Sequence, residues 1–241
     1  MKHILITGAS SGIGKALALY YAQEKCLLSI CGRDKERLYQ VANLCTNLKA
    51  EINEKIIDVA DKTAMQIWIS ECDDYEPIDL IIANAGISGE SNPDLIFDVN
   101  MNGVINTIHP ILPKMIERKN GQIALISSLA GYRGLPSAPA YSASKNFVKA
   151  YGEALRGKHN GDNVKINVIC PGFVRSSITD QNTFPMPGFM EGANAAKIIA
   201  IGLEKNRAVI AFPWFLVFGS WFLSLLPACI FQWIATKLPS K

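Results

Sequence analysis

The sequence lacks the residue clusters by which metal-binding, disulfide-bonded and nucleic-acid-binding proteins are usually recognised. Its six cysteines are scattered without a C-x-x-C pair, and its three histidines lie far apart. This pattern predicts reduced thiols in a cytoplasmic protein and no metal site. There is no run of lysine or arginine, and the net charge of +3 is too small to indicate a nucleic-acid partner.

The N-terminus leaves no room for the apolar core of a secretory signal. Lys2 and His3 lead directly into an apolar run, and a glycine-rich stretch follows within a few residues. Charged residues make up 19% of the chain and hydrophobic residues 49%, with a mean hydropathy of +0.15, so nothing indicates disorder. We expect a single catalytic domain over residues 1–212 and an apolar helical appendage over residues 213–241.

Apolar runs alternate with helical patterns along most of the chain. Strands are predicted near residues 2–7, 27–31, 54–57, 79–83, 123–126, 164–169 and 208–211. A long helical region is predicted from about 93 to 118, where Pro110 and Pro113 favour kinks. Continuous apolar strands separated by helices are typical of a parallel sheet covered on both faces. We therefore expect an α/β fold, a doubly wound, Rossmann-like sheet of about seven strands that binds ligands at its carboxyl edge.

A glycine-rich turn joins the first predicted strand to the first helix. In this context Gly8 allows the tight turn, and Gly12 lets the backbone come close to a pyrophosphate. Gly14 permits close packing of helix on strand. Free N–H groups at the start of the helix would bind the anion. Taken alone, the turn is equally compatible with an ordinary strand-to-helix connection. Its residues are Thr7-Gly8-Ala9-Ser10-Ser11-Gly12-Ile13-Gly14.

The end of the second strand bears on the choice of nucleotide. A fold that binds NAD places an acidic residue there for the ribose 2′-hydroxyl. Here the position holds Gly32, and Arg33 follows at once. A missing carboxylate beside a guanidinium favours a 2′-phosphate, so we expect NADP(H) over NAD(H). The alternative is that Arg33 is only a solvated charge in a loop.

Tyr141 and Lys145 lie four residues apart in the segment Tyr141-Ser142-Ala143-Ser144-Lys145. On a helix, both side chains leave the same face one turn apart. An ammonium beside a phenol favours the phenolate and would lower its pKa from about 10 toward the working range. Without further support, the pair is equally a surface contact.

These motifs, in their order and spacing, resemble the classical short-chain dehydrogenase/reductase family over residues 3–212. Ser128 lies thirteen residues before Tyr141, Asp98-Val99-Asn100 matches the stretch with the family's active-site asparagine, and Ser176 stands where a threonine is more common. The resemblance implies cofactor contacts from Gly8, Ser10, Ser11, Gly12, Ile13 and Gly14 of the glycine-rich turn and from Arg33, Asp58, Val59, Asn84, Ala85, Gly86, Tyr141, Lys145, Pro171, Gly172, Val174 and Ser176.

The resemblance also implies hydride transfer between nicotinamide and a carbonyl or alcohol carbon. Tyr141 would be the acid or base, and Lys145 would tune it and hold the nicotinamide ribose. Ser128 would fix the carbonyl oxygen, and Asn100 would hold a water that relays protons to Lys145. Ser127 and Asn102 are the neighbours that compete for the last two roles. The alternative function is a membrane-associated dinucleotide sensor or scaffold without turnover.

The loop after the sixth strand is rich in phenylalanine and methionine. We expect it to form an adaptable apolar wall for a lipophilic carbonyl or alcohol, with ordinary core packing as the alternative. Beyond Ser128 and Tyr141, the candidate substrate residues are Phe173, Phe184, Met186 and Met190, with Phe189 beside them.

The C-terminal tail carries no charge from Ala208 to Thr236 and holds three of the four tryptophans. Pro227 divides it into two helical pieces, each too short to span a membrane comfortably. Three alternatives remain: peripheral membrane contact through residues 213–236, a lid over the substrate cleft, or a subunit contact. We expect a cytoplasmic homodimer or homotetramer, in peripheral contact with a membrane under the first alternative.

Overall fold

The computed structural model describes residues 1–89, 92–180 and 185–235. Over these residues, seven parallel strands form one sheet in the order β3-β2-β1-β4-β5-β6-β7. This is the predicted Rossmann-like arrangement, and its direction of winding reverses between β1 and β4. The strands are β1 (Lys2–Thr7), β2 (Cys26–Gly32), β3 (Glu51–Ile56), β4 (Leu80–Ala83), β5 (Gln122–Ile126), β6 (Lys165–Pro171) and β7 (Val209–Phe212).

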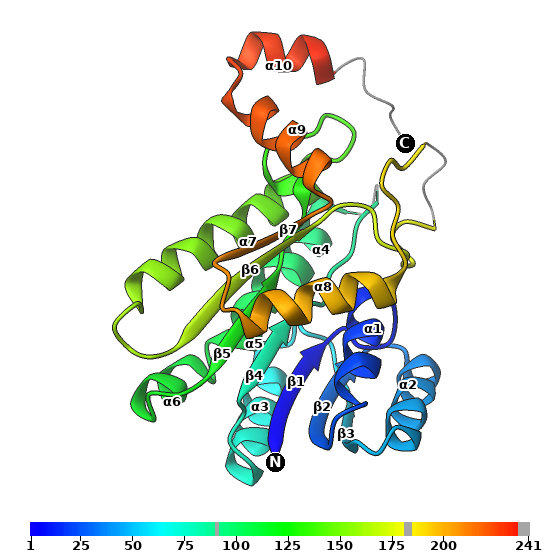
Figure 1. Ribbon diagram of the computed structural model, residues 1–241, viewed down its shortest axis with the longest axis vertical. Helices are drawn as coiled ribbons and strands as arrows, with labels where there is room; N and C mark the ends of the chain where they lie inside the picture. The colour runs from blue at the N-terminus through cyan, green and yellow to red at the C-terminus, as the bar shows by residue number, and fades with distance from the viewer. Residues whose placement is uncertain (90–91, 181–184, 236–241) are drawn as a thin grey trace.

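Helices cover both faces of the sheet (Figure 1). The helices are α1 (Gly12–Tyr21), α2 (Lys35–Asn47), α3 (Lys62–Tyr75), α4 (Pro93–Phe97), α5 (Gly103–Ile108), α6 (Leu112–Glu117), α7 (Pro139–Lys158), α8 (Gly192–Glu204), α9 (Trp214–Leu225) and α10 (Ala228–Ala235). A π-helical segment, η1 (Asp98–Asn102), joins α4 to α5, and a short 3₁₀ turn, η2 (Leu129–Gly131), follows β5.

Alternate strand residues face the two helix layers, as the two-residue period of a strand requires. In β1, Ile4 and Ile6 pack with α1, α2 and α8. Leu5, between them, packs on the opposite side with α3, α5, α6 and α7. Both faces of the strand are therefore buried, which explains why its sequence is a continuous apolar run.

Side-chain caps fix where two helices begin. The Asp34 carboxylate accepts a hydrogen bond from Arg37 N at 3.0 Å, and the Asp61 carboxylate accepts one from Ala64 N at 2.9 Å. Each bond satisfies an N–H group that has no partner in the first helical turn. The caps therefore fix the first residues of α2 and α3.

The predicted helix over residues 93–118 is interrupted. It divides into α4, η1, α5 and α6, with a break at Pro110. β3 also begins three residues earlier than expected, at Glu51. The π-helical segment turns Asn100 into the interior, where its side chain is fully buried. Such insertions are frequent at functional sites because they redirect one side chain within a helix.

The tail folds as the two helices α9 and α10, separated at Pro227. They stand beyond the carboxyl edge of the sheet, away from the N-terminus (Figure 1). Among the described residues, neither these helices nor any other has the length and apolarity needed to cross a membrane.

Candidate active site

The turn between β1 and α1 brings the backbone close to the loop after β4. Gly8 and Gly12 have φ angles of +66° and +54°, a region that favours glycine. A Cβ on Gly8 would lie 2.7 Å from Ala85 Cα. At Gly14 a Cβ would collide with the carbonyl oxygen of Gly8 and lie 2.5 Å from Asn84 Nδ2. Side chains at these positions would push the two loops apart.

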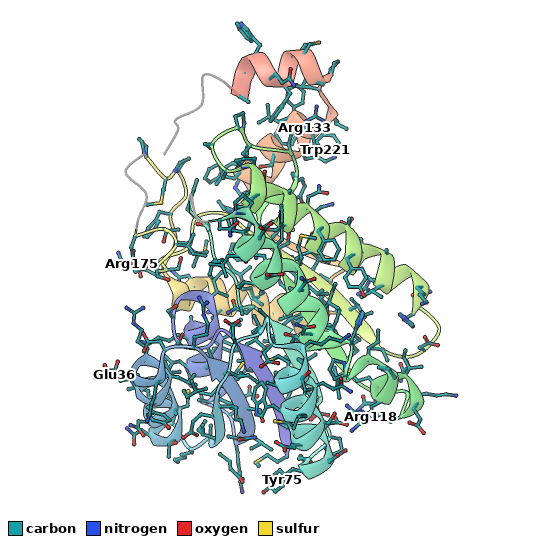
Figure 2. All side chains as sticks on the ribbon, turned by 180° about the vertical axis from the view of Figure 1, so that it is seen from behind. Glu36, Tyr75, Arg118, Arg133, Arg175 and Trp221 are labelled. Carbon is teal, nitrogen blue, oxygen red and sulfur yellow. The ribbon has the colours of Figure 1, made fainter. Side chains whose placement is uncertain are left out.

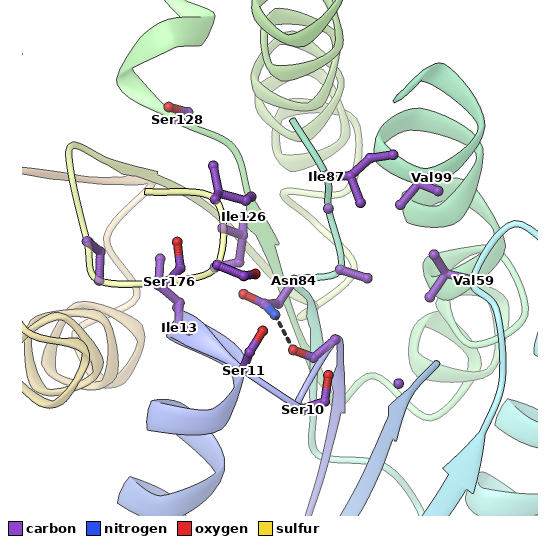
Figure 3. Close-up of a pocket in the computed structure, with 18 of the residues that line it drawn as sticks. Ser10, Ser11, Ile13, Val59, Asn84, Ile87, Val99, Ile126, Ser128 and Ser176 are labelled. Carbon is purple, nitrogen blue, oxygen red and sulfur yellow. Dashed lines mark hydrogen bonds between the residues drawn. The ribbon is translucent and has the colours of Figure 1, made fainter. Parts of the chain in front are cut away.

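Thr7 and Asn84 hold the ends of β1 and β4 together. Thr7 Oγ1 accepts hydrogen bonds from the backbone amides of Asn84 and Ala85 at 3.1 and 3.2 Å. In return, Asn84 Nδ2 donates to the carbonyl oxygens of Thr7 and Gly8 at 2.9 and 3.1 Å. Figure 3 shows the Asn84 side chain next to the glycine-rich turn, with a dashed line for its hydrogen bond. The asparagine thereby holds the turn against the end of β4.

A cavity of about 330 Å³ runs along this edge of the sheet. Every residue proposed above for cofactor binding lines it except Gly14, which packs beneath the turn. Ser10 and Ser11 lie on one side, and Ser128 lies at the other end of the pocket (Figure 3). Some apolar residues of the lining were not anticipated from the sequence, among them Ile57, Ile87, Val99, Ile126 and Ile178.

Two arginines, Arg33 and Arg37, line the end of the cavity beside β2. Arg33 Nη1 lies 3.6 Å from Asp58 Oδ2, and Arg37 Nε lies 3.2 Å from Asp34 Oδ2. Both guanidinium groups are more than half exposed, so these surface pairs hold them only weakly. Sequence reasoning missed Arg37. Its spacing of four residues from Arg33, at the start of a helix, was the available signal.

Ser128, Tyr141 and Lys145 meet at the opposite end of the cavity. The Tyr141 hydroxyl is hydrogen-bonded to the Ser128 side chain, whose oxygen also accepts from Ala130 N at 3.1 Å. Lys145 is buried, and its Nζ donates to the Ile126 carbonyl oxygen at 3.0 Å. The same ammonium lies 5.7 Å from the centroid of the Tyr141 ring.

The pKa of Tyr141 is raised, opposite to the lowering expected from the sequence, and the pKa of Lys145 is lowered. Burial raises the pKa of Tyr141, and its hydrogen bond with Ser128 offsets only part of that effect. The expected lowering of the Tyr141 pKa by Lys145 is not observed: the ammonium donates to the Ile126 carbonyl oxygen. Burial also lowers the pKa of Lys145 from 10.5 to about 8.

Asn100 lies behind the cavity rather than in its lining. Its Oδ1 accepts from Ile87 N at 2.8 Å, and its Nδ2 donates to the Ile87 carbonyl at 2.9 Å and to Ser144 Oγ at 3.0 Å. A Cβ on Gly86 would lie 3.2 Å from both Asn100 Oδ1 and Lys145 Nζ. The side chain therefore fixes the loop after β4 next to the lysine. The water relay stays a prediction.

The neighbours that competed for these roles are used differently. Ser127 Oγ donates to the Lys145 carbonyl oxygen at 2.6 Å, which ties β5 to α7. Asn102 Nδ2 donates to Asp98 Oδ1 at 2.9 Å on the exposed side of η1. Ser128 is thus the serine that is hydrogen-bonded to Tyr141, and Asn100 is the asparagine that faces the interior.

The proposed apolar substrate wall lies outside the lining of this cavity. Met190 packs against the core beneath α1 and α8, and its N donates to the Phe173 carbonyl oxygen at 2.9 Å. The exposed Phe189 ring lies under the Arg175 guanidinium, 5.5 Å from its centroid. Met186 belongs to the same loop, and Phe184 falls outside the described residues. Their role in substrate binding stays a prediction.

The lining fits a nicotinamide dinucleotide. The first turn of α1 has no side-chain cap, so its N–H groups remain available to a pyrophosphate. Cations lie at both ends, with Arg33 and Arg37 beside β2 and Lys145 beside Tyr141. Within the described residues, no group of histidine, cysteine or acidic side chains could hold a metal ion.

Comparisons with known proteins give consistent matches. Residues 2–185 match the family model of the short chain dehydrogenases. An uncharacterized oxidoreductase of Myxococcus xanthus is 36% identical, covering 97% of this chain and 96% of that protein. A 3-oxoacyl-(acyl-carrier-protein) reductase of Thermotoga maritima is 31% identical, covering 75% and 77%.

Solved structures share this fold. A short-chain dehydrogenase from Sphingobium yanoikuyae in complex with NADPH superposes with a TM-score of 0.82 at 22% identity, covering 99% of this chain and 97% of the other. A short-chain dehydrogenase/reductase from Burkholderia phymatum in complex with NAD gives 0.80 at 23% identity, covering 87% and 88%.

Proposed function

Since the chain belongs to the short-chain dehydrogenase family, and hence to the oxidoreductases of that family, we propose that it reduces a carbonyl group on a lipophilic molecule with NADPH. The observation that carries this proposal is the meeting of Ser128, Tyr141 and Lys145 at one end of a cavity whose other end is a glycine-rich turn. A sensor that only binds a dinucleotide would not need these three polar groups together.

The chain's residues divide the work of the reaction. The reduced nicotinamide supplies the hydride. Ser128 donates a hydrogen bond that holds the substrate carbonyl oxygen, as oxyanion donors do. Tyr141 then gives its proton to the oxygen as negative charge develops there. Lys145 keeps a positive charge near the phenol at neutral pH, because its pKa is about 8.

The raised pKa of Tyr141 favours reduction over oxidation at neutral pH. Reduction needs a phenol that carries its proton, which burial provides. Oxidation of an alcohol needs the phenolate, which burial disfavours. We therefore assign carbonyl reduction as the direction at neutral pH, with oxidation favoured by alkaline conditions.

Tyr141→Phe tests the chemical role of the hydroxyl. The substitution keeps the ring and removes the proton donor. We expect NADPH to bind with unchanged affinity while carbonyl-dependent oxidation of NADPH falls by at least about 100-fold, the range of a lost general acid. Full activity of this variant on a substrate of the wild-type enzyme would refute the assignment. Tyr151→Phe makes the same change further along α7, away from the cavity lining, and controls for disturbance of the helix.

The preference for NADP(H) rests on the end of the cavity beside β2. A Cβ on Gly32 would lie 3.1 Å from Ser10 Oγ, and no side chain at that position provides a carboxylate for the 2′-hydroxyl. Arg33 and Arg37 both line the cavity there. We expect Arg33→Ala to weaken NADPH binding roughly tenfold while NADH binding is nearly unchanged, because a charge-assisted bond to phosphate is lost. An unchanged NADPH-to-NADH affinity ratio would remove this part of the proposal.

We further propose that the outer face of α9 and α10 contacts a lipid surface. Trp214 is 80% exposed, and Phe218 and Trp221 are exposed on the same helix. Residues 208–236 carry no charge, whereas protein interfaces normally have a polar rim with hydrogen bonds. Aromatic side chains of this kind favour the membrane interface. Vesicle flotation of the full chain and of a chain without residues 213–241 tests this proposal. We expect only the full chain to float with the vesicles, and equal recovery of the two proteins in the unbound fraction would contradict the proposal.

A further inference from the structure

Ser128 lies between two hydrogen bonds that tie its segment to α7. Before it, the buried Ser127 Oγ donates to the Lys145 carbonyl oxygen at 2.6 Å. After it, Asn146 Nδ2 donates to the Gly131 carbonyl oxygen at 2.8 Å. Lys145 and Asn146 are neighbours in the sequence, so both bonds end on the same turn of the helix. The serine is therefore held to α7 from both sides.

The turn η2 rests directly on the backbone of α7. A Cβ on Gly131 would lie 2.7 Å from both the carbonyl carbon and the carbonyl oxygen of Lys145, and 2.9 Å from Asn146 N. Because Gly131 has no side chain, the backbones of the turn and the helix touch at this point. The bond from the Asn146 amide then keeps the turn at a fixed distance from the helix.

The position of η2 determines where the Ser128 hydroxyl lies. Ser128 is the N-cap of this turn, and its Oγ accepts a hydrogen bond from Ala130 N at 3.1 Å. Gly131 N donates to the Ser128 carbonyl oxygen at 3.0 Å, so the serine and the glycine belong to one hydrogen-bonded turn. Tyr141 lies one helical turn before Lys145, and its hydroxyl is hydrogen-bonded to the Ser128 side chain. A shift of η2 along α7 would therefore change the distance between the two hydroxyl groups.

Beyond η2 the chain is held by the tail. Arg133 donates through Nη1 and Nη2 to the carbonyl oxygens of Ser224 and Leu226, both at 3.1 Å. Figure 2 shows Arg133 beside Trp221, where the tail meets the body of the protein. Since these bonds lead away from α7, the bond from Asn146 is the nearest tie to the helix on this side of the serine.

We propose that Asn146 is a positioning residue for the carbonyl reduction. By holding η2 on α7, it keeps the Ser128 hydroxyl next to that of Tyr141. The inference rests on the proposed function, in which these two hydroxyl groups act on one carbonyl oxygen. Asn146 lies outside the lining of the dinucleotide cavity, so it acts through the serine and not on the reactants. Its side chain is exposed, so substitutions there disturb no core packing.

The first test uses the cofactor-free protein and needs no substrate. Asn146→Ala removes the donor, and Asn146→Asp keeps the shape but turns an acceptor towards the Gly131 carbonyl oxygen. We expect amide hydrogen exchange of residues 129–132 to become about fivefold faster in Asn146→Ala, because one hydrogen bond is lost, and faster still in Asn146→Asp. Asn102→Ala is the control, since it removes a side-chain hydrogen bond of similar length on the exposed side of η1. Equal exchange in Asn146→Ala and the wild type would refute the hold on the turn.

The second test measures the reduction of a straight-chain aldehyde by NADPH. We expect kcat to fall about fivefold in Asn146→Ala and further in Asn146→Asp, because a carboxylate cannot donate to a carbonyl oxygen and repels it. The Kd of NADPH should stay unchanged, since Asn146 does not line the cavity, and Asn102→Ala should keep the wild-type kcat. A wild-type kcat in Asn146→Asp would show that only the shape of the side chain matters and would overturn the inference.

The pH dependence of alcohol oxidation separates positioning from a general loss of structure. The hydrogen bond with Ser128 offsets part of the rise in the Tyr141 pKa that burial causes. A serine that is held less closely gives a smaller offset, so the Tyr141 pKa should rise further in Asn146→Ala. Oxidation needs the phenolate, and its rate with NADP⁺ should therefore begin to increase at a higher pH than in the wild type. A rate that is lower by the same factor at every pH would indicate a merely structural role and contradict the proposal.

These tests separate the inference from the proposed function. If the wild type binds NADPH but reduces no aldehyde or ketone, the proposed function fails, while the exchange result still decides whether Asn146 holds the turn. If both Asn146 variants reduce aldehydes at the wild-type rate while Tyr141→Phe is inactive, the positioning role is refuted and carbonyl reduction stands.

Discussion

Lys145→Met is expected to stabilise the cofactor-free protein while abolishing its activity. Burial lowers the pKa of Lys145 from 10.5 to about 8, which corresponds to a cost of about 3 kcal/mol in the folded state at neutral pH. Methionine fills a similar volume without that charge. The lost hydrogen bond to the Ile126 carbonyl oxygen offsets about 1–1.5 kcal/mol of the gain. The net expected increase in the free energy of unfolding is about 1–2 kcal/mol.

The pH dependence of this difference identifies Lys145 as its cause. Between about pH 8 and 10.5 the unfolded lysine keeps its proton while the folded one has lost it, so the contribution of Lys145 to stability increases with pH. The variant lacks this contribution. Its stability relative to the wild type should therefore be largest below pH 8 and fall by about 2–3 kcal/mol toward pH 10, so that the advantage is lost or reversed there. Buried Cys31, whose pKa is raised to about 12, destabilises both proteins alike as pH rises above 9 and cancels in the comparison.

Urea unfolding followed by tryptophan fluorescence measures the difference at about pH 7 and about pH 10. Lys149→Met is the matched control, since Lys149 lies one turn later on α7 and pairs with Glu153 at 2.8 Å near the surface. We expect no stabilisation from it. If Lys145→Met were less stable than the wild type at pH 7, or if the difference did not change with pH, the cost assigned to the buried ammonium would be wrong.

Three further substitutions or conditions test other parts of the site. Gly14→Ala should lower the free energy of unfolding by at least about 2 kcal/mol in urea titrations, because its Cβ collides with the Gly8 carbonyl and crowds Asn84. Thr7→Val should cost about 2 kcal/mol and weaken NADPH binding, since it removes the acceptor of two backbone amides; an unchanged Kd would count against the brace. The kcat of carbonyl reduction should fall as pH rises past about 8, where Lys145 loses its proton, and a rate that stays level to pH 10 would contradict the role of that charge.

The sheet could be predicted because its signals are local. The strands are short apolar runs, with the exception of the polar edge strand β3, and connections carry their own turn or cap residues, such as Asp34 before α2. The glycine-rich turn likewise lies within eight consecutive residues. Because the strands are parallel, the loops that follow them lie at the same edge of the sheet. The predicted parallel sheet is confirmed for this reason.

The features that sequence reasoning missed depend on contacts between distant segments. The helical region expected over residues 93–118 contains the π-helical segment η1, where the Asn100 side chain bonds the Ile87 backbone through both its oxygen and its nitrogen. Helical periodicity cannot show such an insertion. The direction of the Tyr141 pKa also depends on a distant group. The Ile126 carbonyl oxygen, at the end of β5, holds the ammonium that was expected to act on the phenol.

The same distinction explains why the sequence identifies the chemistry more closely than the substrate. Most of the dinucleotide cavity consists of strand-end residues whose positions the fold determines. The tail helices are instead held by Arg133, whose side chain donates to carbonyl oxygens 91 and 93 residues further along the chain. Gly172 belongs to both parts, since it lines the cavity on one side and closes against Pro213 and Leu216 on the other. Contacts of this kind between distant segments are absent from the local patterns that identify Ser128, Tyr141 and Lys145, so the sequence cannot show how the tail shapes the surroundings of the site.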